Sequence, residues 1–463
     1  MNMNKRPNYS FMYILVAFIV FQPLIDILTT VTVKTMNLPI SFGILMRLAY
    51  MFAMALWVLY ALRFSKYAKW ILYYLIGLAI LVLGNFLMNM QLKDPYYMMQ
   101  EVTFYSKAIY FPIVLLGLIL VFEQFVKERM KLQAVLIQAF TIVGATIGTV
   151  FLVSFVTGTA MSNYGWYKIG WKAWFLSGNE IGSTMAILLP VTALYAMNKM
   201  KSWQQLYAWI PFILLAFGMI LLGTKVGYGG ILITLIAVIG VSLIQMFWTR
   251  EQPRPQSIRT MVTAGVLLVG LIVTTPFTPV YSNIFGQMQF LGVTQQQIDE
   301  ALGEEGEEGE GIEMTAEQFE NLVFSSREVY RADYGHYWER AALGQKLFGM
   351  GYAGLYEHPT EDNPNRPNIV EMDFHDYFYS FGIIGFLYIV APIAYLTFTF
   401  LVRFFRRFKN NCNAFYLMAG VSYVIGLGIA LTAGHVLMAP AVSIYLAFLL
   451  ALLSVEIRKV KVL

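Results

Sequence analysis

About twelve stretches of roughly 20 mostly apolar residues follow one another along this chain, and most are separated by short polar segments. A helix of that length crosses the hydrocarbon core of a bilayer and satisfies its own backbone polar groups there. The composition agrees, with 58% hydrophobic and 13% charged residues. The sequence therefore predicts an all-α polytopic membrane protein, with spans at about 9–29, 39–62, 70–90, 102–122, 132–157, 180–198, 206–223, 226–248, 259–279, 376–402, 413–434 and 436–455.

The distribution of basic residues predicts how these spans are oriented. Lys and Arg gather in every second connecting segment and are sparse in the segments between them. Cytoplasmic loops carry such an excess of positive charge. We therefore expect a cytoplasmic (inner) membrane protein with both termini in the cytoplasm and the segment 280–375 outside the cell. The sparse outer loops carry Lys34, Lys93, Lys168, Lys172 and Lys225.

One long polar segment divides the chain into three parts. Residues 1–279 hold the first nine expected spans, residues 280–375 form a large extracellular loop, and residues 376–463 hold the last three spans. Loops of this length usually carry function or lack fixed structure. The loop is therefore the first place to look for a site.

Short helices are expected within the loop. Gly303–Glu313 is rich in Gly and Glu and cannot bury apolar surface, so it is expected to be a tether. Thr315–Gln318 and Ser325–Glu328 both fit the capping box with which many helices begin. The second helix is expected to run from about Ser326 to Lys346, either unbroken or interrupted at Gly335.

Ionisable residues within the apolar segments all lie toward their extracellular ends. They are Asp26, Arg47, Lys107, Glu180 and Lys225. Such groups are costly in hydrocarbon and suggest a functional site. Asp26 and Arg47 stand at similar depth and can pair, and Lys107 can extend to the headgroups. The alternative is a cluster of Arg47, Lys107 and Lys225 that binds an anionic headgroup.

Two arginines, Arg327 and Arg331, stand four residues apart on the second loop helix. Like charges at this spacing repel each other unless an anion lies between them. Arg331 has Glu328 three residues before it, whereas Arg327 has no acid at either helical spacing. We expect Arg327 to bind a diphosphate ligand or an acid from elsewhere in the chain. The neighbouring Tyr334 and Trp338 suit either sugar stacking or a membrane-interface belt.

Acids and a histidine precede the tenth span, at Glu371, Asp373, His375 and Asp376. They form either a solvated helix start with Asp376 as N-cap, or a site with a catalytic base. Metal binding is disfavoured because no second histidine stands at ligand spacing. Neither a metal nor another cofactor is expected. The pair Gly382–Gly385 then allows another helix to approach closely.

The chain resembles the O-antigen ligase and O-antigen polymerase superfamily, which includes teichuronic acid polymerases of Gram-positive bacteria. The resemblance rests on about twelve spans, the large loop before the last three, the Gly223-Thr-Lys225 corner, and the Gly349-Met-Gly351 stretch that leads to an acidic position and Gly382–Gly385. It implies a metal-independent glycosyltransferase. In the ligases of this family, a histidine stands eleven residues before the first glycine of such a glycine pair. In this chain, the same count back from Gly382 reaches Glu371.

The resemblance also implies roles for particular residues. Lys225 would take the place of a pyrophosphate-binding arginine, Arg327 and Arg331 would add positive charge, and Arg47 and Lys107 are further candidates. Glu371 is the expected base, with Asp373 and His375 as alternatives.

The sequence thus predicts an outer-face enzyme that transfers or polymerises a polyprenyl diphosphate-linked glycan onto a glycan or glycolipid acceptor. Other polysaccharide-assembly proteins are candidate partners, and nucleic acid is not. A transporter or flippase, or a non-catalytic glycan-binding scaffold, are the alternatives.

Overall fold

The computed structural model describes residues 9–36, 41–125, 129–165, 168–249, 252–292, 315–353 and 369–458. The expected tether Gly303–Glu313 lies outside these residues.

The chain up to the long loop forms helices joined by short turns. Its elements are α1 (Tyr9–Val20), α2 (Gln22–Met36), α3 (Phe42–Ala61), α4 (Lys66–Leu92), α5 (Met98–Glu123), α6 (Arg129–Val156), α7 (Gly178–Lys199), η2 (Trp203–Trp209), α8 (Ile210–Leu222), α9 (Lys225–Ile244), η3 (Gln245–Thr249), α10 (Arg254–Thr274) and η4 (Thr275–Phe277).

The loop and the last spans are helical as well. Their elements are α11 (Pro279–Phe290), α13 (Ala316–Phe324), α14 (Arg327–Arg340), α15 (Leu343–Phe348), α16 (Asp373–Arg406), α17 (Phe408–Asn411), α18 (Ala414–Thr432) and α19 (Pro440–Arg458).

These helices confirm a polytopic all-α membrane protein. Among the described residues, 10 segments are long and apolar enough to cross a membrane as single spans. The helices α1 and α2 pass the same test as a pair bent by 51°, and Pro440–Val455 of α19 is a shorter apolar helix. Each of the twelve expected segments coincides with one of these elements.

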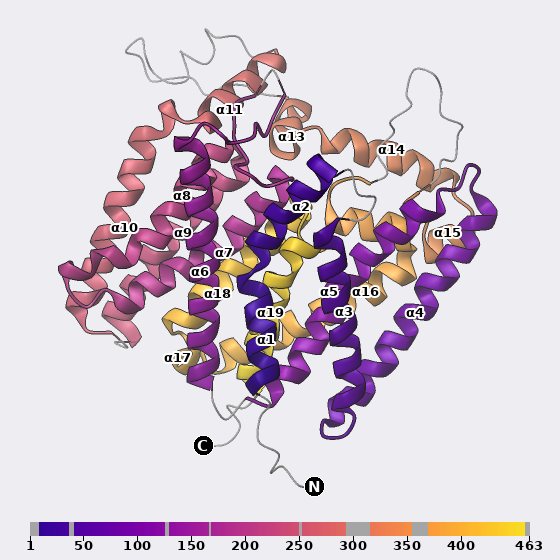
Figure 1. Cartoon of the computed structure of the whole chain (residues 1–463), viewed down its shortest axis with the longest axis horizontal. Helices are drawn as coiled ribbons and strands as arrows, with labels where there is room; N and C mark the ends of the chain where they lie inside the picture. The colour runs from indigo at the N-terminus through magenta and orange to yellow at the C-terminus, as the bar shows by residue number, and fades with distance from the viewer. Residues whose placement is uncertain are drawn as a thin grey trace.

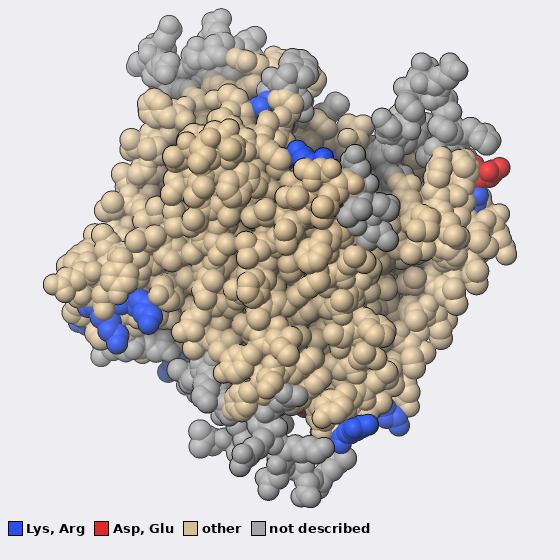
Figure 2. Space-filling model, in the orientation of Figure 1, with Lys and Arg blue, Asp and Glu red and all other residues tan. Residues whose placement is uncertain are grey.

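The spanning helices stand side by side, and the loop helices lie across one end of the bundle. Figure 1 shows α11, α13, α14 and α15 at this end, whereas α1 begins and α19 ends at the opposite end. We call the first end the loop end. On the face drawn in Figure 2, the charged side chains lie toward the two ends and the broad band between them carries none. Such a band suits a bilayer.

Helix α7 forms the centre of the bundle. In its most apolar stretch, 89% of the residues are buried within the protein, against 11% in α4. It packs against α6, α9, α18 and α19. Because α7 is enclosed by protein and begins at the loop end, the residues of its first turn are held firmly where a site can form.

The corner between α8 and α9 needs almost no loop, as expected. Gly223 ends α8 with a φ of 72°, and the Thr224 side chain accepts a hydrogen bond from the Gly227 amide at the start of α9. A Cβ atom on Gly223 would lie 2.4 Å from the Ile169 carbonyl oxygen. Only glycine fits this position, because it tolerates both the left-handed backbone and the close approach.

The loop helices partly follow the sequence. The expected capping box at Thr315 is confirmed, since its hydroxyl and the Gln318 side chain form both hydrogen bonds. The expected box at Ser325 is wrong, because Ser325 and Ser326 adopt left-handed φ angles of 56° and 71° and end α13. The expected helix from Ser326 to Lys346 is neither unbroken nor interrupted at Gly335, which lies within α14. Extended backbone at residues 341–342 divides it into α14 and α15.

Glycines allow α15 to dock against the start of α16. Gly382 interrupts α16 with a φ of 69°. A Cβ atom there would lie 2.5 Å from the Gly349 nitrogen, and one on Gly349 would lie 2.0 Å from the Ser380 oxygen. The expected close approach at Gly382 is thus observed, and its partner is the loop segment that includes α15.

Candidate functional site

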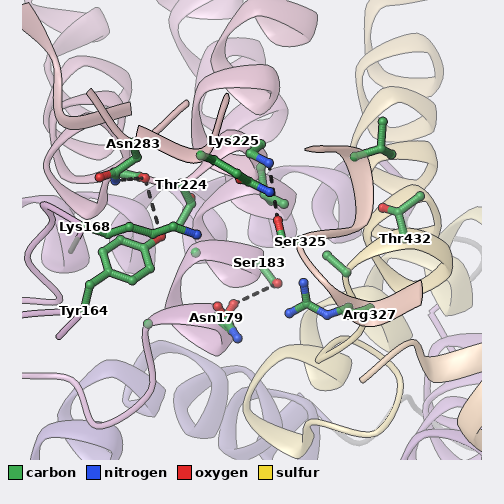
Figure 3. Close-up of a pocket in the computed structure, with 17 residues that line it drawn as sticks. Tyr164, Lys168, Asn179, Ser183, Thr224, Lys225, Asn283, Ser325, Arg327 and Thr432 are labelled. Atoms are coloured by element: carbon green, nitrogen blue, oxygen red, sulfur yellow. Dashed lines mark hydrogen bonds between the residues drawn. The ribbon is translucent and has the colours of Figure 1, made fainter. Parts of the chain in front are cut away.

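A pocket of about 250 Å³ opens at the loop end of the bundle (Figure 3). Five parts of the chain surround it: the connection between α6 and α7, the first turn of α7, the α8–α9 corner, the loop helices, and the end of α18. The residues that line it are Tyr164, Lys168, Gly178, Asn179, Gly182, Ser183, Gly223, Thr224, Lys225, Val226, Asn283, Gln287, Val323, Ser325, Arg327, Thr432 and Ala433.

Two helices begin at this pocket. The side chains of Ser177 and Thr224 cap α7 and α9, respectively, by accepting hydrogen bonds from first-turn amides. The first amides of a helix and its dipole favour a negative charge nearby. Both helix starts therefore favour an anionic ligand.

One amide side chain ties the pocket walls together. Asn283 of α11 donates to the Ile169 and Gly223 carbonyl oxygens at 2.7 and 2.8 Å, and its own oxygen accepts from the Ile169 amide at 2.7 Å. Gln287, one turn later, donates to the Asn321 carbonyl oxygen of α13 at 3.0 Å. Helix α11 thus joins the α6–α7 connection, the α8–α9 corner and the loop helices.

Three cationic side chains from separate segments line the pocket. Lys225, at the start of α9, donates to the Leu322 carbonyl oxygen and lies 3.4 Å from the Ser325 hydroxyl. Lys168, from the α6–α7 connection, lies over the Tyr164 ring at 5.8 Å. Burial, and next the positive charge of Arg327, lower the pKa of Lys168. Such mutual repulsion is relieved when an anion binds between the cations.

The third cation, Arg327, reaches from the pocket to a carboxylate. Its Nη2 lies 3.2 Å from Glu371 Oε2, and its Nε donates to the Glu371 carbonyl oxygen at 3.1 Å. Its Nη1 donates to the Phe324 carbonyl oxygen at 3.2 Å. Of the two expected partners of Arg327, the structure thus contains the acid from elsewhere in the chain.

Glu371 lies between Arg327 and a histidine of the turn between α18 and α19. His435 Nε2 lies 3.6 Å from Glu371 Oε2. His435, above all, lowers the pKa of the Glu371 carboxyl, and Arg327 adds to this effect. Burial lowers the pKa of His435, but the Glu371 carboxylate outweighs it and raises that pKa above its ordinary value. The two side chains therefore favour the carboxylate and imidazolium forms.

Asp373 fixes the turn that carries His435. Its carboxylate accepts hydrogen bonds from the amides of His435, Val436 and Leu437, at 3.1, 2.9 and 2.7 Å. All of its carboxylate contacts in the described chain are thus made to this turn. Asp373 accordingly organises the backbone beside Glu371.

The other acid of the cluster has a structural role. The Asp376 carboxylate is buried and accepts the Val370 amide at 2.6 Å. The expectation that Asp376 is the N-cap of this helix is wrong, because α16 already begins at Asp373. His375 is half-buried, and its Nδ1 has no hydrogen-bond partner in the described chain.

The remaining expected phosphate ligands lie outside the pocket lining. Arg47 forms an ion pair with Asp26, which is the pairing that the sequence offered as one alternative. Lys107 lies over the Phe104 ring at 5.4 Å.

Arg331, in the second turn of α14, does not line the pocket either. Arg331 lies 3.4 Å from Glu320. Two of the aromatic residues of this helix, Tyr334 and Trp338, pack α14 onto α16. The rings of Trp338 and Phe378 are 4.8 Å apart, and those of Tyr334 and Tyr379 are 5.6 Å apart.

Several residues of the site have no role predicted from the sequence, and Lys168 and His435 are the basic ones among them. Lys168 was counted only as one basic residue of a sparse outer loop. His435 received no role, although it is one of 4 histidines in the chain and follows Gly434 at the outer end of a predicted span. This position, next to a glycine at the end of a predicted span, could have identified His435 as a candidate site residue. Within the described ranges, no group of three or more His, Cys, Asp or Glu side chains could hold a metal ion.

Comparison with protein families supplies a match. A family model described as O-antigen ligase like membrane protein matches residues 8–460, which is nearly the whole chain. No curated protein matches the chain.

Proposed function

The chain belongs to the family of O-antigen ligase like membrane proteins, and from this premise we propose that it is a glycosyltransferase that acts on a polyprenyl diphosphate-linked glycan. It is a multi-pass membrane protein of cell-surface glycan assembly. We place the loop end outside the cell and the reaction there. The acceptor is a hydroxyl group of a second glycan or glycolipid.

The observation that carries the proposal is the convergence of three cations on one pocket. Lys168, Lys225 and Arg327 come from three separate segments, and two helix starts face the same space. A diphosphate that links a lipid to a sugar carries one negative charge on each phosphate and gains another when its bond to the sugar breaks, so the three cations match the leaving group. The pocket lies at the membrane end, where a lipid carrier can bring such a headgroup while its chain stays in the bilayer.

The polar residues around these cations suit the sugar next to the diphosphate. Asn179 and Ser183 stand one turn apart at the start of α7, and both line the pocket. Amide and hydroxyl side chains supply the donors and acceptors that sugar hydroxyls need.

Chemically, the site suits displacement at an anomeric carbon. The acceptor oxygen attacks this carbon, and the bond to the diphosphate breaks with its electron pair going to the leaving group. Lys168, Lys225 and Arg327 stabilise the charge that develops there. Glu371 accepts the proton of the acceptor hydroxyl. Asp373 is less suited because its carboxylate accepts three amides of the 435–437 turn.

Analysis of a deletion strain tests the proposal. Cells without the chain should lose one surface polysaccharide and accumulate its polyprenyl diphosphate-linked precursor. The purified chain in proteoliposomes should then convert the lipid extract of those cells into a longer or transferred glycan. Accumulation of the precursor on the cytoplasmic face alone would instead indicate a flippase. A polysaccharide of normal amount and length would exclude the enzyme.

A further inference from the structure

We propose that His435 is a positioning residue for Glu371, which orients the carboxylate toward the acceptor hydroxyl and sets the pH range of turnover. The inference rests on the proposed function, because it concerns the carboxylate that accepts the proton.

The two carboxylate oxygens of Glu371 have different surroundings. Arg327 Nη2 and His435 Nε2 lie 3.2 and 3.6 Å from the same atom, Oε2. Within the described chain, Oε1 has no hydrogen-bond partner. One oxygen therefore accepts a hydrogen bond from Arg327 and faces His435 at ion-pair distance, while the other is available to a hydroxyl group. A base that is fixed in this way avoids a search among rotamers before each proton transfer.

The backbone around this pair is held in an uncommon conformation. Glu371 and His435 both have positive φ angles, 64° and 59°, although neither is glycine. Gly434, with a φ of 62°, lies so close that a Cβ atom on it would be 2.3 Å from the Glu371 carbonyl oxygen. Left-handed residues of this kind are costly and persist where the surroundings impose them, often at functional sites.

A purely structural role would not require the two side chains to face each other. The turn at His435 is already fixed by three amide hydrogen bonds to Asp373, and these involve only backbone atoms of residues 435–437. Fold and turn are thus secured without the imidazole. The His435 side chain is half-buried, at 22% exposure, and its Nε2 lies 3.6 Å from the Glu371 carboxylate.

The charged groups around His435 are mostly acidic. Glu371 and Asp373 face it from the start of α16, and Glu180 faces it from the first turn of α7. Arg327 lies beyond Glu371. These acids stabilise the imidazolium, in agreement with its raised pKa. The imidazolium in turn holds the Glu371 carboxyl ionised before the acceptor arrives.

These contacts indicate the path of the transferred proton. The acceptor hydroxyl gives its proton to Glu371 Oε1 while the bond from the anomeric carbon to the diphosphate breaks. Glu371 then returns the proton to water, which is favoured because Arg327 and the imidazolium lower its pKa. When His435 loses its proton at higher pH, the carboxylate loses one of its two holding groups and turnover falls.

The substitution His435→Asn tests this role. Asparagine tolerates the left-handed backbone and has no titratable group. In proteoliposomes supplied with lipid extract from the deletion strain, kcat should fall about 10- to 100-fold with little change in donor KM. The alkaline limb of the pH profile should disappear, and the acid limb should move to higher pH because Glu371 has lost a cationic neighbour. A uniform fall at every pH, or an unchanged profile, would overturn the proposal.

A matched control comes from another histidine. His336 of α14 is 73% exposed and lies 4.0 Å from Glu339. The substitution His336→Gln should leave both limbs of the profile in place.

A second variant, His435→Gly, also suits the positive φ and leaves space for a free imidazole. Added imidazole should restore part of its kcat, and lack of rescue in a folded His435→Gly chain would count against the proposal.

A direct titration separates this inference from the proposed function. The chain has only 4 histidines, so isotope-labelled histidine in a nanodisc should give few signals, and His435→Asn identifies the relevant one. Its pKa should lie above 6.5 and should fall in Glu371→Gln. If this coupling is seen but no glycan is made, the proposed function fails alone. If glycan is made and the coupling is absent, the role of His435 fails alone.

Discussion

Arg327 and Glu371 form an ion pair across 44 residues of sequence, with Nη2 and Oε2 3.2 Å apart. The pair joins the cationic pocket to the proposed base. Arg327 lines the pocket, whereas Glu371 lies behind it, beside His435. An anion that binds Arg327 therefore also changes the electrostatic surroundings of Glu371. Donor binding and proton acceptance are thus coupled through one guanidinium group.

The first prediction concerns the base. Glu371→Gln keeps the size of the side chain and removes its ability to accept a proton. We expect turnover of the lipid-linked donor to fall about 10²- to 10⁴-fold, as is typical when a general base is lost. Expression and membrane insertion should be unchanged. Glu339→Gln is the matched control, because the Glu339 side chain is 78% exposed on α14. Normal polymer length in Glu371→Gln would remove Glu371 from the mechanism.

The second prediction concerns the diphosphate clamp. Separate changes to alanine at Lys168, Lys225 and Arg327 should each raise the donor KM about 10- to 100-fold, as expected for loss of roughly 1.5–3 kcal/mol from a charged hydrogen bond. The measurement is donor KM in proteoliposomes, with undecaprenyl diphosphate as competitor. Lys346→Ala is the control, since Lys346 is a half-buried lysine of the same loop that contacts the Glu339 carbonyl oxygen and does not line the pocket.

An additional change separates charge from geometry at Arg327. Arg327→Lys keeps the positive charge but loses the planar group that makes contacts through Nε, Nη1 and Nη2. We expect it to recover little of the lost affinity. If none of the alanine variants alters donor KM, the pocket does not bind the diphosphate.

The third prediction separates the role of Asp373 from that of Glu371. Asp373→Asn keeps the size of the side chain but loses the charge that accepts three backbone amides of the 435–437 turn. We expect a loss of about 2 kcal/mol in stability, seen as a lower Tm in detergent, because charged hydrogen bonds are lost. Activity should fall together with Tm. An unchanged Tm with lost activity would instead make Asp373 a candidate base.

The fourth prediction follows from the ionisation of Glu371 and His435. The lowered pKa of Glu371 gives stability that is complete above its ordinary 4.5 and is lost as the pH falls through the lowered value. The raised pKa of His435 gives stability that is complete below its ordinary 6.5 and is lost as the pH rises through the raised value. Both contributions are therefore complete only between these two ordinary values.

Thermal melting at several pH values tests this window. The Tm difference between the native chain and Glu371→Gln should be largest between about pH 4.5 and 6.5 and should shrink on either side. The alkaline decrease should be partial, because Arg327 stays charged and keeps its contact with Glu371. A Tm difference that does not vary with pH would show that the ion pair contributes nothing.

Local rules of sequence predicted most of the fold. Apolar length located the spans, and Gly223 with Thr224 indicated a corner without a loop. The capping box at Thr315 was predicted for the same reason, since both of its hydrogen bonds lie within four residues. Ser325 offered the same pattern and failed. Its hydroxyl instead lies beside Lys225, so a contact from a distant segment, rather than the local motif, decides its position.

The site depends on contacts that no local rule contains. The family resemblance, counted back from Gly382, indicated Glu371, but its partner His435 lies 64 residues later in the sequence, after the three helices α16, α17 and α18. Lys168 reaches the pocket because hydrogen bonds from Asn283 hold the α6–α7 connection there. Arg47 and Lys107 were expected at the same depth as the pocket, yet depth alone did not indicate which side of a helix they occupy.

The last prediction concerns the glycines that hold the loop end together. Gly349 and Gly382 have φ angles of 103° and 69°, and a Cβ atom on either would lie 2.5 Å or less from backbone atoms of the facing segment. Alanine at either position should cost at least about 1–3 kcal/mol of stability, because the strained backbone and the steric clash act together. Both changes should also lower activity, since they displace the start of α16 that follows Glu371.

Gly428 of α18 provides the control, because a Cβ atom there would meet nothing within 4 Å. Gly428→Ala lies within a helix and should be neutral or stabilising by about 1 kcal/mol. Melting curves and product analysis of the three variants provide the measurement. A Gly349→Ala or Gly382→Ala chain as stable and active as Gly428→Ala would show that the close packing of α15 on α16 is not required for the site.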